Sequence, residues 1–432
     1  MKNRLFGLIA IGVIMSVSVA SCSPASPAIP APEESEPAAE QVLKVGVLGP
    51  FTGPSARVGE EFQDSVTMAF DAVDWEIGGY KLETVWIDSE SDPEKGTRAY
   101  EQAVLRDEID CGLMSWHSTV AVPVMEVAAK YKIPHFFGFA ATGTILEKYQ
   151  SDPEKYSYWM GKTWPDPAKL TLAYVISLED AIEQGLWQPA EKKVALYGND
   201  TEWGRNFAEA LGSQLEDAGW EIVATEFVPV GETDFYPLLT KLQELNVPLI
   251  AGTMSDTAGF TALIKQSREV ELESLIIADG LGWIGEWYDL TGEASNYVLD
   301  QIPQWTTAEA QAFKVDFEER WGIEPGASSA GLAYDMANFF VELAQATYDE
   351  HGELNSETLY TFGQEKLWGG EFTFTDGILM EEYKYTPETA PDPIVDKGYF
   401  IFPVIQYLNG EGSIVWPDEW KATDMQVPAH MK

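Results

Sequence analysis

Cysteine and histidine are scarce in this chain of 432 residues, which has two cysteines, Cys22 and Cys111, and four histidines. Two cysteines cannot build a disulfide framework. The histidines show no metal-ligand spacing with one another or with Cys111. We therefore expect neither a metal site nor a cofactor held by thiols or imidazoles.

Basic residues are also few: 27 Lys and Arg face 70 Asp and Glu, for a formal charge of −43. Phosphate recognition requires clustered Lys and Arg, so this balance argues against binding to nucleic acid. It also disfavours adsorption to anionic lipid. Because the acids are spread along the chain, they predict a solvated, soluble surface.

Catalytic motifs are missing too, since the chain has no G-x-S-x-G, Walker or H-E-x-x-H sequence. One segment, Gly280–Gly285, does match G-x-G-x-x-G after a predicted strand. Trp283 within it is bulky for a phosphate turn, no clear helix begins at Gly285, and Asp279 would repel a pyrophosphate. We therefore predict no cofactor and no enzymatic activity.

Only one long apolar run occurs, Leu5–Val19, and it is shorter than the ~20 residues of a membrane-spanning helix. With Lys2 and Arg4 before it, this run predicts a targeting segment over residues 1–21. Val19-Ala20-Ser21-Cys22 resembles a bacterial lipoprotein signal, in which the thiol of Cys22 receives a diacylglycerol. A plain secretory signal is the alternative. Residues 22–41 are rich in Pro, Ala and Glu and predict an extended tether from an extracytoplasmic membrane surface.

From residue 42 onward, apolar strands and amphipathic helices alternate, which predicts an α/β fold with parallel sheets. The first series includes strands at Leu43–Leu48 and Leu82–Ile87. The alternation breaks near Thr163–Pro167, and a second series follows, which predicts a second lobe with its own sheet. Around Leu299–Pro303 the chain is expected to cross back. Later segments predict two helices, a hairpin-like stretch and a terminal β-hairpin: Ala308–Arg320, Ala330–Tyr348, Gly370–Met380, and Tyr399–Gln406 with Ser413–Val415.

The stretch from Cys111 to Thr144 organises the first series. It predicts a strand at Cys111–Met114, a helix at Thr119–Lys130 and a parallel strand at His135–Phe139. Hydroxyl residues follow both strands, at the edge where open α/β sheets bind ligands. Free amides at the start of the helix would favour an anion there. Alternatively, these hydroxyl residues only cap helices or fill loops.

Several segments together resemble the type I periplasmic binding proteins of branched-chain amino-acid and amide ABC transporters. The resemblance runs from Val42 to about Trp416. It rests on KVGVLGPFTGPSARVGEEF, DPEKGTRAYEQAV, the HS…P…FAATG pair, GNDTEWGRNFAEAL, TDFYPLLTKLQ, GLAYDMANFF, GGEFTFT and FPVIQY…G…VWP.

The resemblance implies two Rossmann-like lobes with parallel sheets, joined by three crossovers, that close over a ligand like a Venus flytrap. The N-terminal lobe would comprise residues 42–163 and 303–385, and the C-terminal lobe residues 164–302 and 386–432. It also implies that the ligand is a hydrophobic amino acid or small amide. An ABC permease and its ATPase subunits would be the partners.

By the same resemblance, Ser118, Thr142 and the backbone near Ala140 and Ala141 would contact the ligand's carboxylate and ammonium groups, and Asp279 would pair with the ammonium. Other expected pocket positions depart from the family pattern and leave the side-chain preference open: Val58, Trp116, His117, Trp203, Met254 and Ser255. A ligand-presenting sensor subunit, an α/β enzyme acting on acyl or amide substrates, and a binder of aromatic acids, urea or sugars are the alternatives.

Overall fold

The computed structural model describes residues 41–305, 307–380, 382–395, 399, 403–418, 420–428 and 431. The predicted targeting segment, Cys22 and residues 23–40 of the predicted tether lie outside this part of the chain. Within it, no helix combines the length and the apolar character that crossing a bilayer requires.

The first sheet has six strands in the order β2-β3-β1-β4-β5-β6. Every neighbouring pair is parallel except β2 and β3, which are antiparallel. Its strands are β1 (Val42–Gly49), β2 (Glu76–Ile77), β3 (Tyr80–Asp88), β4 (Cys111–Leu113), β5 (His135–Gly138) and β6 (Trp159–Lys162).

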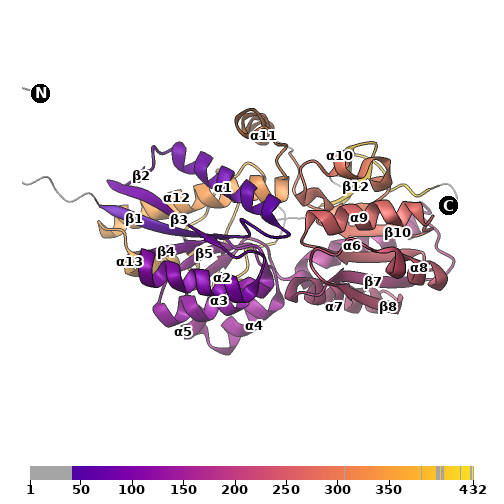
Figure 1. The fold of residues 1–432 in the computed structure, drawn as a ribbon, viewed down its shortest axis with the longest axis horizontal. Coiled ribbons are helices and arrows are strands. Elements are labelled where there is room, and N and C mark those ends of the chain that lie inside the picture. The colour runs from indigo at the N-terminus through magenta and orange to yellow at the C-terminus, as the bar shows by residue number, and fades with distance from the viewer. Residues whose placement is uncertain are drawn as a thin grey trace, which may run out of the picture. The chain divides into compact units, whose positions relative to one another are not determined.

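Helices cover both faces of this sheet, as a parallel sheet with two apolar faces requires. On one face, Val45 packs in a core with Phe62 of α1 and Phe340 of α12. On the other, Leu48 packs in a separate core with Val120 of α3. Figure 1 shows the late helices α12 and α13 beside the first strands of the chain. The helices of this half are α1 (Ala56–Asp71), α2 (Pro93–Gln102), α3 (Ser118–Tyr131), α4 (Gly143–Ser151), α5 (Pro153–Tyr156), α11 (Ala308–Trp321), α12 (Leu332–His351) and α13 (Ser356–Phe362), with π-helical turns η1 (Ala103–Asp107), η4 (Ala327–Gly331) and η5 (Gly363–Leu367).

The second sheet has seven strands in the order β13-β12-β11-β10-β9-β7-β8. The strands from β11 to β8 are parallel, and the last two strands of the chain add an antiparallel edge. Its strands are β7 (Lys193–Asn199), β8 (Glu221–Val228), β9 (Leu249–Thr253), β10 (Leu275–Asp279), β11 (Leu299–Gln301), β12 (Val404–Leu408) and β13 (Glu411–Trp416).

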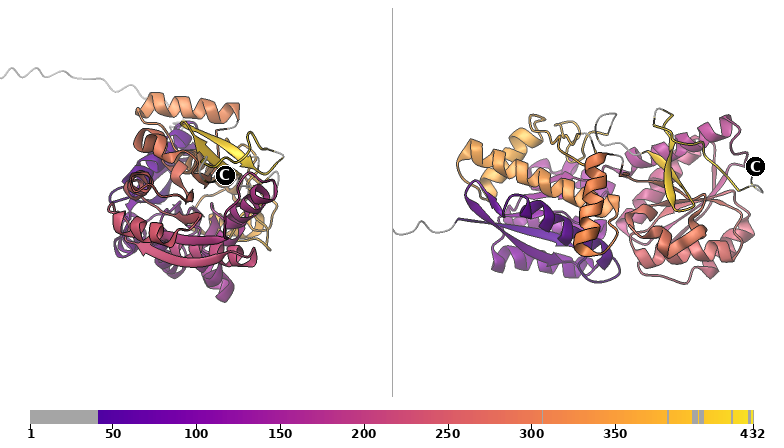
Figure 2. Two further views of the ribbon diagram at one scale, coloured as in Figure 1. Left: turned by 90° about the vertical axis from the view of Figure 1, so that its right-hand side faces the viewer. Right: turned by 90° about the horizontal axis from the view of Figure 1, so that it is seen from above.

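After β6 the chain passes to the second sheet. After β11 it returns to the helices beside the first sheet, and before β12 it passes to the second sheet again (Figure 2). The helices beside the second sheet are α6 (Pro167–Glu183), α7 (Glu202–Asp217), α8 (Tyr236–Leu245), α9 (Thr257–Glu269) and α10 (Trp287–Thr291), with short 3₁₀ turns η2 (Leu281–Trp283) and η3 (Gly292–Ser295). The predicted α/β class with two mainly parallel sheets is confirmed.

Several local predictions are confirmed as well, including the strand, helix and parallel strand at β4, α3 and β5. The terminal hairpin pairs β12 with β13, and both residues of its Asn409-Gly410 turn have positive φ, as a tight hairpin turn needs. The hairpin-like stretch predicted at Gly370–Met380 is confirmed only in part. One antiparallel bridge joins Phe374 to Tyr383, beyond the predicted end, and the described residues of the stretch form no regular strand.

Hydrogen bonds to a buried acid, Asp335 of α12, hold that irregular stretch in place. Its carboxylate accepts hydrogen bonds from the backbone N–H groups of Ile378 and Leu379 and from the Tyr383 hydroxyl, at 2.8, 3.2 and 3.0 Å. Burial raises the pKa of Asp335 to about 7, although these three donors lower it in part. The folded state therefore binds a proton here that the unfolded chain releases near pH 4.

This shift predicts how stability depends on pH. Because the folded pKa is the higher one, the contribution of Asp335 is largest at low pH and is lost as pH rises from about 4 to about 7. Wild type should lose ~2–3 kcal/mol more stability than Asp335→Asn between about pH 5 and pH 8. Thermal and urea unfolding of both proteins measures the difference, and parallel pH profiles would contradict the assignment. Glu61, whose pKa burial also raises to about 7, is present in both proteins and cancels.

Candidate functional site

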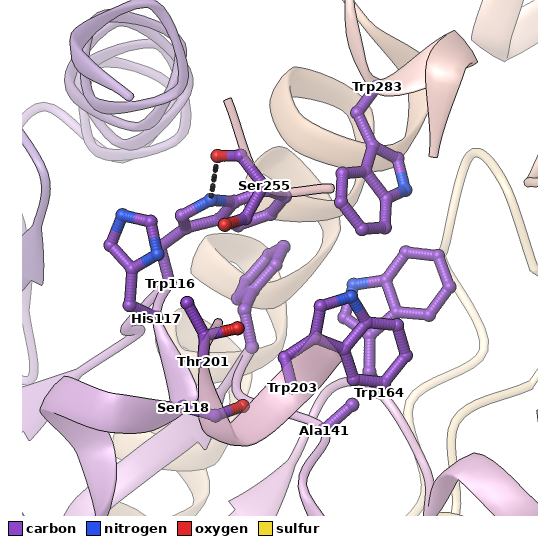
Figure 3. A pocket seen from close by; sticks show the side chains of 10 residues that line it. Trp116, His117, Ser118, Ala141, Trp164, Thr201, Trp203, Ser255 and Trp283 are labelled. Atoms are coloured by element: carbon purple, nitrogen blue, oxygen red, sulfur yellow. Dashed lines mark hydrogen bonds between the residues drawn. The ribbon is translucent and has the colours of Figure 1, made fainter. Parts of the chain in front are cut away.

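A pocket lies where the carboxyl ends of strands from both sheets meet, the edge at which open α/β sheets bind ligands. Loops after β4, β5 and β6 of the first sheet and after β7, β9 and β10 of the second supply its wall. It encloses about 410 Å³ of space free of protein atoms, part of which opens to solvent. The lining residues, most of them labelled in Figure 3, are Trp116, His117, Ser118, Phe139, Ala141, Trp164, Thr201, Trp203, Ser255 and Trp283.

Four indole rings form most of this wall, and Trp283 of η2 contacts the other three. Its ring centroid lies 5.1 Å from that of Trp116, 6.1 Å from that of Trp164 and 6.5 Å from that of Trp203. The corresponding interplanar angles are 82°, 64° and 44°, so none of these three pairs is parallel. Figure 3 shows the labelled rings at different orientations around the pocket.

Two of these indole N–H groups are committed to acceptors within the protein. Trp203 donates to Thr253 Oγ1 at 2.9 Å, and Trp116 donates to the carbonyl of Ser255 at 3.4 Å. The second bond crosses from the first half of the chain to the second. The Nε1 atom of Trp283 is buried and has no acceptor among the described residues. Trp116 and Trp203 can therefore contact a ligand with the faces of their rings.

The start of α3 supplies the polar part of the wall. Helix α3 begins at Ser118, its N-cap residue is His117, and no side chain of the described residues caps it. Neither the Ser118 nor the Thr119 backbone N–H has an acceptor in the part of the chain that the structure describes. Exposed amides at a helix N-terminus favour a negatively charged group. The first turn of α3 can therefore bind a carboxylate, with the Ser118 hydroxyl beside it.

The wall carries no formal charge at neutral pH, because no Asp, Glu, Lys or Arg is among the described residues that line it. The one titratable side chain among them is His117, and burial lowers its pKa to about 4. Its imidazole is therefore neutral above about pH 5. Across the described residues, no three side chains of His, Cys, Asp or Glu are grouped as metal ligands.

The structure brings six of the predicted positions together in this wall: Trp116, His117, Ser118, Ala141, Trp203 and Ser255. Five others do not line it: Val58, Ala140, Thr142, Met254 and Asp279. The sequence reasoning missed Phe139, Trp164, Thr201 and Trp283. Thr201 and Trp283 follow predicted strands and Phe139 ends one, so a position at a strand end was the available signal, but many loop residues share it. Trp164 lies in the segment Thr163–Pro167, before which no strand was predicted.

Thr142 serves the fold in a different way, because its hydroxyl caps α4. Its Oγ1 accepts from the backbone N–H of Thr144 at 3.2 Å and donates to Oδ1 of Asn206 in α7 at 2.9 Å. The same Asn206 oxygen accepts from the Gly143 N–H at 2.9 Å. Thr142 is completely buried. It thus joins the two halves of the chain beside the pocket, with its hydrogen bonds already made.

Asp279 lies behind the pocket, where the Tyr174 hydroxyl donates to its Oδ1 at 2.8 Å. Burial raises the pKa of Asp279 well above its usual range, and the negative charge of Asp300 raises it further. Burial raises the pKa of Asp300 too, but its hydrogen-bond donors lower it in part. Its carboxylate accepts from three backbone N–H groups, those of Gly280, Gly282 and Gln301, and from the Tyr407 hydroxyl, at 2.7–2.8 Å.

This arrangement also explains the glycine-rich segment at Gly280–Gly285. The amides that would cradle a phosphate in a nucleotide site bind the Asp300 carboxylate instead. The segment continues into the short turn η2 and not into a long helix. The prediction that it is no nucleotide site therefore has a structural reason.

An ion-pair cluster beside the pocket also joins the two halves. The Arg57 guanidinium in α1 donates to both carboxylate oxygens of Glu286, at 3.2 and 3.0 Å, and to the carbonyl of Glu324 at 2.7 Å. It also pairs with Glu61 at 3.0 Å. Such bidentate contacts are among the stronger polar interactions in proteins. Val58, the next residue, is buried in this packed region and does not reach the pocket.

Comparisons with known proteins fit this geometry. A sequence model of the periplasmic binding protein family matches residues 42–382. The Leu/Ile/Val-binding protein BraC3 of Rhizobium johnstonii is 23% identical over 375 residues, which cover 78% of this chain and 95% of that protein.

Two solved structures of solute-binding proteins share the fold. The branched-chain amino acid transporter substrate binding protein LivJ of Streptococcus pneumoniae, in complex with isoleucine, has a TM-score of 0.68 and 19% identity, covering 86% of this chain and 98% of that one. A solute binding protein of an ABC transporter from Rhodopseudomonas palustris, in complex with 3,4-dihydroxy benzoic acid, has a TM-score of 0.69 and 19% identity, covering 86% and 95%.

The two buried acids behind the pocket give a testable contrast. Asp300→Asn replaces an anion with four donors by an amide whose N–H₂ faces donors, so it should destabilise the protein by ~2–4 kcal/mol. Asp279→Asn changes a carboxyl group whose pKa is raised well above its usual range by burial and by Asp300, so replacing it with a neutral amide should cost less than ~1 kcal/mol. Thermal unfolding near pH 7 measures both. An equal loss for the two variants would show that Asp279 is also ionised.

Proposed function

We propose, from the premise that this chain belongs to the periplasmic binding protein family, that it is a lipid-anchored receptor for a small organic carboxylate and delivers this ligand to an ABC permease. Members of this family are solute-binding proteins of ABC transporters, and the branch that this chain resembles is the one of the branched-chain amino-acid binders. The proposed ligands are an amino acid, a related small amide or another carboxylate of similar size.

One observation carries the proposal: a pocket without charged side chains among its described lining lies between the two sheets, and the amides at the start of α3 open onto it. A carboxylate placed at Ser118 would satisfy these amides. The rest of the ligand would then lie among the four indoles, where an apolar or weakly hydrated group is favoured.

Hinge closure is the mechanism that suits this pocket, since both halves of the chain supply its wall. The first half gives Trp116 and Ser118, and the second gives Trp203 and Trp283. A ligand that contacts both halves binds the closed form more tightly than the open form, and it shifts the population by that difference in affinity. Periplasmic binding proteins are a standard example of domain closure around a ligand, so this step follows the family's known behaviour. The closed form would be the one that docks on the permease.

The carboxylate assignment predicts a loss of affinity in Ser118→Ala. A hydrogen bond to a charged group contributes ~1.5–3 kcal/mol, so the variant should bind its carboxylate ligand about ten- to a hundredfold more weakly. Ser115→Ala is the matched control, because the Ser115 hydroxyl is buried nearby, has no hydrogen-bond partner among the described residues and does not line the pocket.

A thermal-shift screen of the mature protein first identifies the ligand, using leucine, isoleucine, valine, benzoate, acetamide, urea and glucose. Isothermal titration calorimetry then compares the two serine variants with wild type. Equal affinities in Ser118→Ala and wild type would remove the carboxylate from the start of α3. A turnover assay on the same compounds should return every one of them unchanged, since a binding protein releases its ligand intact.

The lipid anchor is tested at the N-terminus, which lies outside the described residues. If Cys22 is acylated, mass spectrometry of the membrane-extracted protein should show a mature chain that begins at Cys22 and carries a diacylglycerol. Cys22→Ser should release the protein from the membrane fraction, because one or more acyl chains provide most of the membrane affinity of such a protein. A mature wild-type chain without lipid would instead support the plain secretory signal.

A further inference from the structure

The pocket poses an electrostatic problem for an ordinary amino acid. A primary ammonium carries three N–H donors and a full charge, and it needs acceptors and a counter-charge when it is buried. No carboxylate of the described residues lines this pocket. Two acids close to lining residues in sequence are buried without lining the pocket: Asp279 accepts from the Tyr174 hydroxyl, and Asp256 caps α9 by accepting from the Gly259 N–H at 2.7 Å.

We propose that the ligand is a small quaternary ammonium carboxylate, with its trimethylammonium group held by the faces of the indole rings and its carboxylate at the start of α3. This inference rests on the proposed function and specifies the class of ligand for the same pocket.

The indole faces suit such a cation for two reasons. Trp has the strongest cation–π attraction of the aromatic side chains, and the attraction grows when the ring and the cation are both shielded from water. Trp164, Trp203 and Trp283 are only 5%, 8% and 8% exposed. Because the N–H groups of Trp116 and Trp203 already bind Ser255 and Thr253, these two rings turn their faces and not their polar edges to a ligand.

The indole rings around the pocket have different orientations. The plane of Trp283 meets those of its three indole neighbours at 82°, 64° and 44°. An aryl ligand would meet such rings by offset stacking or edge to face, whereas a rounded cation can contact faces of several orientations at once. Figure 3 shows the labelled indoles at different orientations around the pocket, an arrangement that a near-spherical trimethylammonium group can use.

A quaternary ammonium also needs no hydrogen-bond acceptor, and the described lining offers a cation no carboxylate. It has no N–H donor to satisfy, and its charge is spread over methyl groups that contact the rings directly. The neutral imidazole of His117 adds no positive charge that would repel it. At the other end, the N–H groups of Ser118 and Thr119, which have no acceptor in the described chain, and the Ser118 hydroxyl can bind the carboxylate.

The decisive experiment varies the ligand's charge while keeping its shape. Glycine betaine and 3,3-dimethylbutanoate have the same outline and the same carboxylate, but only the first carries a cation. Calorimetry on the wild-type protein should give betaine about tenfold or more tighter binding than its carbon analogue, because only a cation is attracted to the ring faces. Equal or tighter binding of the analogue overturns the cation assignment.

Further probes test the two ends of the ligand separately. Dimethylglycine and glycine, which retain N–H donors, should bind progressively more weakly than betaine. Choline, which lacks the carboxylate, should bind about tenfold more weakly or worse than betaine. Choline binding as tightly as betaine would overturn the placement of a carboxylate at α3.

Trp283 offers a clean substitution, because its Nε1 has no acceptor among the described residues and a change to Phe removes no hydrogen bond. Trp283→Phe should keep part of the preference for betaine over the analogue, and Trp283→Leu should abolish most of it. Trp321→Leu is the control: its Nε1 is likewise without a partner in the described chain, and it lies outside the pocket at the end of α11. If Trp283→Leu fails to fold, the ratio measured on wild type still decides.

Failure of this inference can be told apart from failure of the proposed function. If leucine or benzoate binds more tightly than betaine and Ser118→Ala weakens that binding, the quaternary ammonium is wrong and the carboxylate receptor stands. If betaine binds but neither Trp283→Leu nor Ser118→Ala weakens it, the pocket is not the site and both proposals fall. Absence of binding by every probe overturns both as well.

Discussion

The arrangement of this protein depends on the burial of indole rings from both halves of the chain in one pocket, whose described lining contains no charged side chain. Trp116 extends from the first sheet, and Trp203 and Trp283 extend from the second. The ring contact between Trp116 and Trp283 and the hydrogen bond from Trp116 to Ser255 join the two halves. If the halves close over a ligand as proposed, forming this pocket and closing the halves are one event, and a ligand that binds there favours the closed form.

Several acids are buried in the described part of the fold, and none of them lines the pocket. Asp300 is surrounded by four donors from its own half, and Asp335 by three, so neither needs a cation from a ligand. Glu61 is held by Arg57 and by the Gly326 N–H. Backbone amides and hydroxyls thus neutralise charge locally, in keeping with the rule that buried polar groups are hydrogen-bonded. The remaining acids contribute to the strongly negative formal charge of the chain.

Much of the fold follows from local sequence pattern, because period and turn chemistry act over a few residues. The β4-α3-β5 unit and the Asn409-Gly410 hairpin are examples. The stretch Gly370–Met380 is different, since its conformation is fixed by a distant carboxylate, Asp335, that no local pattern reveals. Similarly, a hydroxyl after a strand can either face a ligand or cap a helix. Ser118 lines the pocket and Thr142 caps α4, and the difference lies in the position of Asn206 on another helix.

The location of the candidate site could be predicted from the sequence, but its set of lining side chains could be predicted only in part. Strand ends located it, but the role of Asp279 depends on Asp300, which parallel pairing of β10 with β11 brings near it. Among 15 tryptophans, only the fold singles out Trp164 and Trp283 as wall residues.

A crystal structure of the protein with the tightest-binding compound tests the central claim most directly. The account predicts ligand density enclosed by Trp116, Trp164, Trp203 and Trp283 and touching Ser118. Density at any other place, with these rings packed against one another, would contradict it.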